Sequence, residues 1–266
     1  MAIKLTIFVF FLLLLHKIHS ESVSFGFDFK DGVPPSMILL GDAIPYARVI
    51  LLNRVDEKPG TNHYVGRAVY ATPIRLWDND SGEVADFTTE FYFSVSTGSS
   101  DLRGDGLTFF MAPVADAVRV PENSTGGLFG LFSPETAFSP PQNGILAVEL
   151  DTFSNEWDPP FPHVGIDVNS LMSVNITSWP IHDTALGSVW NVRISYESKT
   201  KTLSVSMGYP GANPPTLVSL SRVIELKDVL PEYVRIGFSA ATGALIETHN
   251  LFAWSFRSFL AEESSP

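Results

Sequence analysis

The sequence predicts an all-β protein of the β-sandwich type, on three observations. Many short stretches alternate apolar and polar residues, or are rich in aromatic and β-branched residues, as strands are. Clusters of glycine and proline separate these stretches. No stretch shows a convincing helical period over about ten residues. The expected strands cover 22–29, 87–95, 106–112, 189–196, 202–207, 233–239 and 252–256.

The local sequence predicts the type of each element along the chain. Residues 22–29 alternate with a period of two, which indicates a strand with one buried face. Residues 197–201 are polar and lie between two expected strands, so they predict a hairpin turn. Residues 226–230 precede a proline and predict one short helical turn. Two long irregular stretches, 113–124 and 132–142, are expected to be functional loops.

The N-terminus predicts a secretory signal peptide over residues 1–20. A lysine, Lys4, precedes an apolar run that ends near the small residue Ser20. This run is shorter than the roughly 20 residues that a membrane-spanning helix needs, although an N-terminal anchor is the alternative. The remainder predicts one domain over 21–260 and a flexible tail over 261–266, with no internal repeat or linker.

Composition narrows the partners and the location. The chain has 266 residues, no cysteine and a formal net charge of −12. An acidic surface repels phosphates, so neither nucleic acid nor a membrane is an expected partner. A signal peptide implies the secretory pathway, ending outside the cell or in a storage vacuole. Three Asn-x-Ser/Thr sequons offer glycosylation sites at Asn79, Asn123 and Asn175.

The strongest functional signal lies between Glu149 and His163. After an apolar run, alternation along a strand places Glu149, Asp151, Phe153 and Asn155 on one face. Carboxylates gathered there would repel each other unless a cation lay among them, and a proline-rich loop can fold Asp158 and His163 back onto this face. Oxygen ligands suit calcium, and carboxylates with an imidazole suit a transition ion such as manganese. We therefore predict a two-metal site; the alternative is a solvated acidic loop.

This stretch, with the run Gly-Ile-Asp-Val-Asn-Ser at 165–170, resembles the metal loop of the legume lectin family of plant L-type lectins. The resemblance extends from about Ser24 to Phe256. It implies a jelly-roll sandwich of the concanavalin-like type, with a flat back sheet and a curved front sheet. It also implies a manganese-type ion on Glu149, Asp151, Asp158 and His163, and calcium on Asp151, the Phe153 carbonyl, Asn155 and Asp158.

The stretch 103–113 also resembles the family, and in it Asp105 lies between two glycines. A simple turn is the alternative explanation. In the family, the corresponding aspartate hydrogen-bonds two sugar hydroxyls and follows a cis peptide, usually after alanine. The resemblance therefore implies that Asp105 binds sugar. This chain departs from the pattern with Gly104 in place of the alanine.

Two further stretches, 125–130 and 241–250, resemble sugar-binding loops of the family. In the first, the backbone N–H of Gly127 would reach a sugar hydroxyl, because glycine lets a ligand approach closely; a plain glycine turn is the alternative. In the second, the N–H groups of Ala244 and Leu245 would do the same. Many relatives carry a polar residue where this chain has Leu245. The implied carbohydrate-binding set is Asp105, Gly127, Phe153, Asn155, Ala244 and Leu245, with the Phe153 ring as its apolar face.

The length of one loop and the shallow site lead to expectations about the sugar, the partners and the assembly state. The loop at 243–254 is short, which in the family accompanies mannose or glucose binding rather than galactose binding. The expected partners are glycans or glycoproteins. A shallow sugar site binds weakly, so a homodimer or homotetramer that presents several sites is also expected.

Two other functions stay open at this stage. A glycoside hydrolase on a similar sandwich would need a further acid, but Asn155 stands at the wanted position and Glu156 has the wrong spacing from Asp151. A lectin-like storage or defence protein without sugar binding would keep the same fold. The sequence favours a secreted lectin without catalytic activity.

Overall fold

The computed structural model describes residues 21–53, 62–97, 103–139, 143–183, 187–210, 212–213 and 216–261. The predicted signal peptide, and the predicted tail from residue 262 onward, lie outside the described residues. Among the helices in the described ranges, none is both long and apolar enough to cross a membrane.

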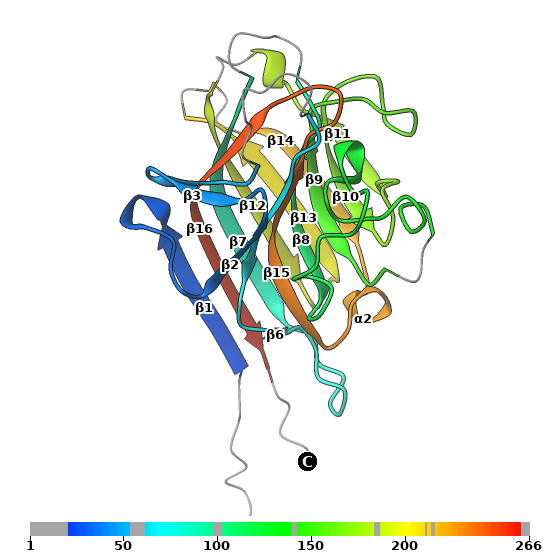
Figure 1. The fold of residues 1–266 in the computed structure, drawn as a ribbon. Helices are drawn as coiled ribbons and strands as arrows, with labels where there is room; N and C mark the ends of the chain where they lie inside the picture. Colours follow the sequence, from blue (N-terminus) through cyan, green and yellow to red (C-terminus); the bar gives the residue numbers. More distant parts are fainter. Residues whose placement is uncertain are drawn as a thin grey trace, which may run out of the picture.

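Two antiparallel sheets, each eight-stranded within the described residues, face each other (Figure 1). The back sheet has the order β14-β13-β12-β7-β16-β4-β3, and β1 pairs with β16. Its strands are β1 (Glu21–Asp28), β3 (Ile44–Tyr46), β4 (Val49–Leu51), β7 (Asp86–Ser96), β12 (Val189–Glu197), β13 (Thr202–Gly208), β14 (Thr216–Val223) and β16 (Thr248–Leu260).

The front sheet has the order β11-β10-β9-β8-β15-β5-β2, and β6 pairs with β15. Its strands are β2 (Met37–Gly41), β5 (Val65–Tyr70), β6 (Ile74–Arg75), β8 (Gly106–Pro113), β9 (Leu146–Asp151), β10 (His163–Val168), β11 (Asn175–Ser178) and β15 (Tyr233–Ala241). The short helices are η1 (Phe29–Asp31), η2 (Gly126–Leu128), η3 (Ile181–Asp183) and α2 (Leu226–Val229). The predicted all-β sandwich and the predicted helical turn are confirmed.

The main core lies between the two sheets. In β13 Leu203, Val205 and Met207 are buried and the residues that alternate with them are half-buried, as in a strand with one face toward a core. Aromatic rings join the sheets: Phe238 of the front sheet contacts Phe91 and Trp254 of the back sheet, with centroids 4.8 and 4.9 Å apart. Offset or edge-to-face aromatic pairs add stability beyond their buried area.

A second apolar cluster covers the outer face of the front sheet. Phe110 and Ala147 point out of β8 and β9 and pack against Phe129, Phe132 and other residues of the long loops after β8. As a result, β9 is buried on both faces along its whole length. Polar side chains at the outward positions of β8, β9 and β10 are therefore held inside the protein, and this positions the candidate site.

Candidate functional site

The metal-ligand candidates meet on the outer side of two neighbouring strands. Strands β9 and β10 pair antiparallel, so that His163 lies opposite Asp151 and Gly165 opposite Glu149. Glu149, Asp151 and His163 each offer a ligand atom, and these atoms all lie within 4.8 Å of one another. All three residues are buried. The Oε1 atom of Glu149 lies 2.9 Å from Nε2 of His163.

The loop after β9 brings the remaining candidates alongside. The N–H of Phe153 donates to Oδ1 of Asp151 at 2.7 Å, and the N–H of Asn155 donates to Oδ2 of Asp158 at 2.9 Å. These bonds turn the chain back toward the strand end. The carboxyl of Asp158 is then close enough to raise the pKa of Asp151 by repulsion. The turn also leaves Glu156 exposed.

Two further residues, the buried Asp167 and the half-buried Ser173, belong to this cluster, and the sequence analysis did not identify them as members. The Ser173 hydroxyl oxygen lies 2.6 Å from both Glu149 Oε1 and Asp167 Oδ1, which share its one proton. A side chain at Gly165 would collide with Ser173 and Glu149, so the glycine provides their space. Alternation along 163–168 places Gly165 and Asp167 on the face of His163, and this signal could have revealed Asp167 but not Ser173, which lies beyond the strand.

Electrostatics shows that the cluster suits cations. Burial, and then repulsion from Glu149, raises the pKa of Asp151 and of Asp167 well above the usual range. Burial also raises the pKa of Asp158, against a lowering hydrogen bond from Asn155. Buried carboxylates are costly as uncompensated charges. Three buried atoms here have no protein partner: His163 Nδ1, Asn155 Oδ1 and Asp167 Oδ2. Carboxylate, amide and imidazole donors in this arrangement fit a calcium and a transition ion.

Asp105 lies beside this cluster at the start of β8. The Gly104–Asp105 peptide is cis, as the resemblance implied. The N–H of Asp105 donates to the Ala241 carbonyl at 3.2 Å, and its own carbonyl accepts from the Thr152 N–H at 2.9 Å. Its Oδ2 is buried without a partner. Burial raises the pKa of Asp105 to about 7, with smaller contributions from Glu247 and Asp158.

Glycines let the predicted sugar-site residues approach one another. A Cβ at Gly127 would overlap the Asn155 amide, and one at Gly243 would lie 2.9 Å from Asp105 Oδ2. A Cβ at Gly104 would lie 3.2 Å from Phe153 Cβ and 3.4 Å from Leu245 Cβ. Ala244 is exposed in the same loop. The structure thus brings together the four stretches that the sequence analysis singled out. They contribute Asp105, Gly127, Phe153–Asn155 and Ala244–Leu245.

The model of the legume lectin domain matches residues 22–265 of this chain. The chain belongs to the legume lectin family. Legume lectins generally bind metal ions, and the cluster at Glu149, Asp151 and His163 can hold one.

Individual relatives agree with this assignment. The lectin chain is 47% identical over 248 residues to Lectin 10 of Medicago truncatula, covering 91% of this chain and 85% of the relative. It is 43% identical over 248 residues to a mannose/glucose-specific lectin of Centrolobium tomentosum, covering 91% and 97%. A solved structure described as lectin UEA-II complexed with galactose is 40% identical, with a TM-score of 0.78 over 89% of this chain and 98% of that chain.

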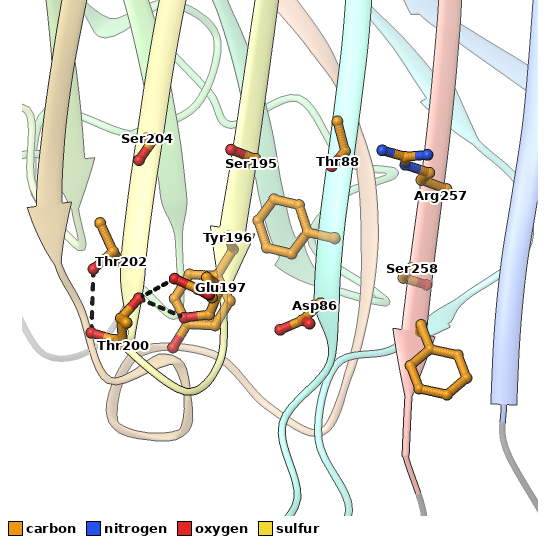
Figure 2. Close-up of a pocket in the computed structure, with 12 residues that line it drawn as sticks. Asp86, Thr88, Ser195, Tyr196, Glu197, Thr200, Thr202, Ser204, Arg257 and Ser258 are labelled. Carbon is orange, nitrogen blue, oxygen red and sulfur yellow. Dashed lines mark hydrogen bonds between the residues drawn. The ribbon is translucent and has the colours of Figure 1, made fainter.

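A hollow in the surface of this lectin lies away from the candidate site (Figure 2). It has a volume of about 720 Å³ on the outer face of the back sheet. Figure 2 shows Thr88, Ser195 and Arg257 on neighbouring strands along one wall of it. These hydroxyls and charges lie at an open surface, and the described residues there include no metal-ligating cluster. Buried unpartnered polar atoms, rather than size, distinguish the candidate site.

The three sequons lie in different settings. Asn79 is exposed in a turn after β6. Asn123 is exposed in a left-handed backbone conformation four residues before Gly127. Asn175 lies in β11, and its Nδ2 donates to the Ser221 carbonyl at 2.8 Å. Glycosylation at these positions stays a prediction.

Proposed function

We propose that this legume lectin is a secreted carbohydrate-binding protein that depends on calcium and a manganese-type ion and has no catalytic activity. The observation that carries the proposal is the Asp105 carboxyl, which is buried, lacks a partner on Oδ2 and is bordered by glycines. A carboxylate in this position can accept hydrogen bonds from sugar hydroxyls, because a carboxylate offers acceptors and the edge of a sugar offers hydroxyl donors.

The other residues complete a small polar site with one apolar side. The backbone N–H groups of Gly127, Ala244 and Leu245 donate to sugar oxygens, and the Asn155 Nδ2 donates as well. The Phe153 ring contacts the C–H face of the sugar. These roles follow from the resemblance, and the close approach of the four stretches supports them.

Metal ions hold the loops of this site in place. Calcium would be held by Asp151, the Phe153 carbonyl, Asn155 and Asp158, and the manganese-type ion by Glu149, Asp151, Asp158 and His163. The ions supply positive charge, which stabilises the ionised carboxyls and keeps Asp105 charged at neutral pH. Asn155 then serves both functions, with its oxygen toward calcium and its nitrogen toward the sugar.

Mannose or glucose is the sugar that we propose. Residues 248–254 of the stretch 243–254 belong to β16, so the loop itself covers only residues 242–247. This short loop supports the proposal, because loop length sets how the sugar ring turns while Asp105 and Asn155 keep two hydroxyls. The mannose/glucose-specific lectin of Centrolobium tomentosum, which is 43% identical to this chain, also supports mannose or glucose. Galactose is the second candidate, and the galactose complex of the similar lectin UEA-II favours it.

Secretion and assembly complete the proposal. The N-terminal pattern of residues 1–20 directs the chain to the secretory pathway and then to the cell exterior or a storage vacuole. Subunits assemble as a homodimer or homotetramer, because several weak sites on one particle bind glycoproteins more tightly than a single site does. No nucleic acid or membrane partner is proposed.

A glycan array, probed with metal-loaded protein and with protein treated with EDTA, tests the function. We expect binding to mannose- or glucose-terminated glycans that EDTA abolishes. Asp105→Asn removes the charged acceptor while keeping its shape, so it should abolish binding with the metals retained. Asp86→Asn is the matched control, because Asp86 is an exposed carboxylate of the back sheet that accepts from Ser198.

The same experiment separates the alternatives. Metal-loaded wild-type protein that retains no glycan would support a storage or defence protein without sugar binding. Release of reducing sugar from oligosaccharides would support a glycoside hydrolase. Such an enzyme would need a second acid, and the nearest one after Asp151, Glu156, is exposed in the turn.

A further inference from the structure

A buried polar network lies behind Asp105, and neither the metal roles nor the sugar roles use it. Asn53, Glu247 and His249 are each 0% exposed. Asn53 follows β4, whereas Glu247 immediately precedes β16 and His249 is the second residue of that strand. Buried titratable side chains are rare unless they are paired, so this network requires an explanation.

Backbone contacts fix the orientation of Asn53 and hence of the histidine ring. Asn53 Nδ2 donates to the Glu247 carbonyl at 2.6 Å, and Asn53 Oδ1 accepts from the His249 N–H at 3.0 Å. That same oxygen lies 2.8 Å from His249 Nδ1. Because the oxygen can only accept, Nδ1 carries a proton. The other ring nitrogen, Nε2, is thereby directed at Glu247 Oε1, 2.8 Å away.

Glu247 connects this network to the sugar site through one hydroxyl. The Thr152 hydroxyl has one proton, which is shared between two acceptors: Glu247 Oε1 at 2.7 Å and the Asp105 carbonyl at 3.0 Å. The Thr152 N–H donates to the same carbonyl at 2.9 Å. The backbone of Asp105 is therefore held from one side by Thr152, and Thr152 is held by Glu247.

The electrostatic effect on Asp105 is consistent with this geometry. Two carboxyls raise the pKa of Asp105 by repulsion after burial, and the effect of Glu247 is larger than that of Asp158 in the metal loop. Glu247 is thus a neighbouring carboxyl that acts on the sugar-binding carboxyl, although it lies outside the metal cluster.

We infer that Glu247 is a positioning residue of the sugar site: oriented by His249 and Asn53, it acts through the Thr152 hydroxyl to fix the backbone of Asp105. The inference rests on the proposed function, in which Asp105 binds sugar. Its consequence is that sugar affinity depends on a residue that touches neither sugar nor metal.

The back sheet offers a matched control for Thr152. Thr89 is also buried, and its hydroxyl donates to the Ser255 carbonyl at 3.0 Å while accepting from Trp254 Nε1 at 2.8 Å. Thr89→Val and Thr152→Val therefore remove similar buried hydroxyls. We expect both to lower the melting temperature. Only Thr152→Val should weaken binding of methyl mannoside or methyl galactoside, by about fivefold, which is what one ordinary hydrogen bond contributes. Thr152→Ser should restore the affinity.

A double-mutant cycle tests whether Glu247 acts through that hydroxyl. Sugar affinity is measured by calorimetry on protein whose calcium and manganese content has been verified by elemental analysis. Glu247→Ala should weaken sugar binding in the wild-type background and have little further effect in the Thr152→Val background. If Glu247→Ala does not fold, Glu247→Gln replaces it in the cycle. Equal effects in both backgrounds, or an unchanged affinity in every variant, would overturn the inference.

A measurement without sugar separates this inference from the proposed function. Hydrogen exchange of the backbone around residues 103–106 should be faster in Thr152→Val and Glu247→Ala than in wild type, and unchanged in Thr89→Val. If wild-type protein binds neither methyl glycoside, the proposed function fails, and the exchange rates alone decide whether Glu247 positions Asp105. Unchanged exchange in all variants would overturn the positioning role.

Discussion

The outer faces of the two sheets differ although the sheets share size and antiparallel pairing. On the back sheet, hydroxyls and charges such as Arg257 line an open hollow (Figure 2). On the front sheet, the corresponding outward positions hold Glu149, Asp151, His163 and Asp167, all buried. The long loop after β8 covers the front face, and its apolar side chains pack against outward side chains of the strands to form the second core there.

The difference shows that loop coverage, rather than strand pattern, creates the functional site. Alternation gives both sheets one apolar and one polar face. A polar face left open to water, as in the back sheet, carries charges at little cost. The same face under a cover must pair its charges or hold a cation. The acidic cluster of this lectin therefore exists only in combination with its loops.

The largest expected effect comes from removing a shared metal ligand. Asp158→Ala takes a carboxylate from both proposed ions, so we expect both metals and sugar binding to be lost. A ligand present at a hundredfold excess over its Kd stabilises a protein by about 2.7 kcal/mol. At about 2–4 °C per kcal/mol for a domain of this size, the melting temperature should fall by roughly 5–10 °C. Elemental analysis and calorimetry measure both quantities.

The back face supplies the control for this prediction. Asp86→Ala removes an exposed carboxylate that accepts from Ser198, and it should leave metal content and sugar binding unchanged. A variant Asp158→Ala that kept its full metal content would contradict the ligand assignment, and with it the contrast between the two faces.

The pH dependence should have opposite signs with and without metal. In the metal-free protein, burial raises the pKa of Asp105 to about 7 and that of Asp151 well above its usual range. Carboxyls with raised folded-state pKa values stabilise the fold fully below their unfolded pKa of about 4, and lose that contribution as the pH rises through the folded value. The metal-free melting temperature should therefore fall as the pH rises from about 4 to about 7.

Metal-loaded protein should behave in the reverse way, because the ligands bind ions only when deprotonated. Its stability and sugar binding should decline as the pH falls below about 5. Melting temperatures recorded across this pH range, with metals and with EDTA, give two curves that should diverge as the pH rises. Parallel curves would show that the buried carboxyls do not interact with the ions as proposed.

Two strand glycines, one on each sheet, give a prediction of intermediate size. Gly165 in β10 borders Ser173 and Glu149, and a Cβ there would collide with both side chains. Gly26 in β1 has room, since its Cβ would lie 4.0 Å from Ser255. Gly165→Ala should weaken binding of the manganese-type ion by about tenfold and cost about 1–3 kcal/mol of stability. Gly26→Ala should change stability by less than about 0.5 kcal/mol.

Metal titration followed by calorimetry distinguishes the two glycine variants. Equal behaviour of Gly165→Ala and Gly26→Ala would mean that the front-face cluster adjusts as freely as the open back face. That outcome would remove the structural reason for glycine at position 165.

The extent to which this site could be predicted depends on sequence separation. The meeting of Glu149, Asp151 and His163 could be predicted, because the first two alternate along one strand and the third follows a short proline-rich loop. The network at Asn53 could not, because its hydrogen bond to the Glu247 carbonyl joins positions 194 residues apart. Short strands such as β6, which has two residues, were also missed, since two residues cannot show a period.

The smallest expected effect concerns sugar choice at the rim of the site. Leu245 is half-buried, and its Cβ lies near Gly104. A backbone contact from Leu245 is independent of its side chain, so Leu245→Asn should retain metals and basic sugar binding. The apolar Leu245 side chain is expected to favour sugars with an apolar substituent. The ratio of the affinities for an aryl mannoside and for methyl mannoside should therefore be about two- to threefold lower in the variant, as expected for a small apolar area. Phe259→Asn, at an exposed aromatic residue of the back sheet, is the control and should change nothing.

Competition on a mannose column measures both variants and the wild type. Elution of the wild type by galactose but not by methyl mannoside would refute the argument from loop length while leaving the metal site intact.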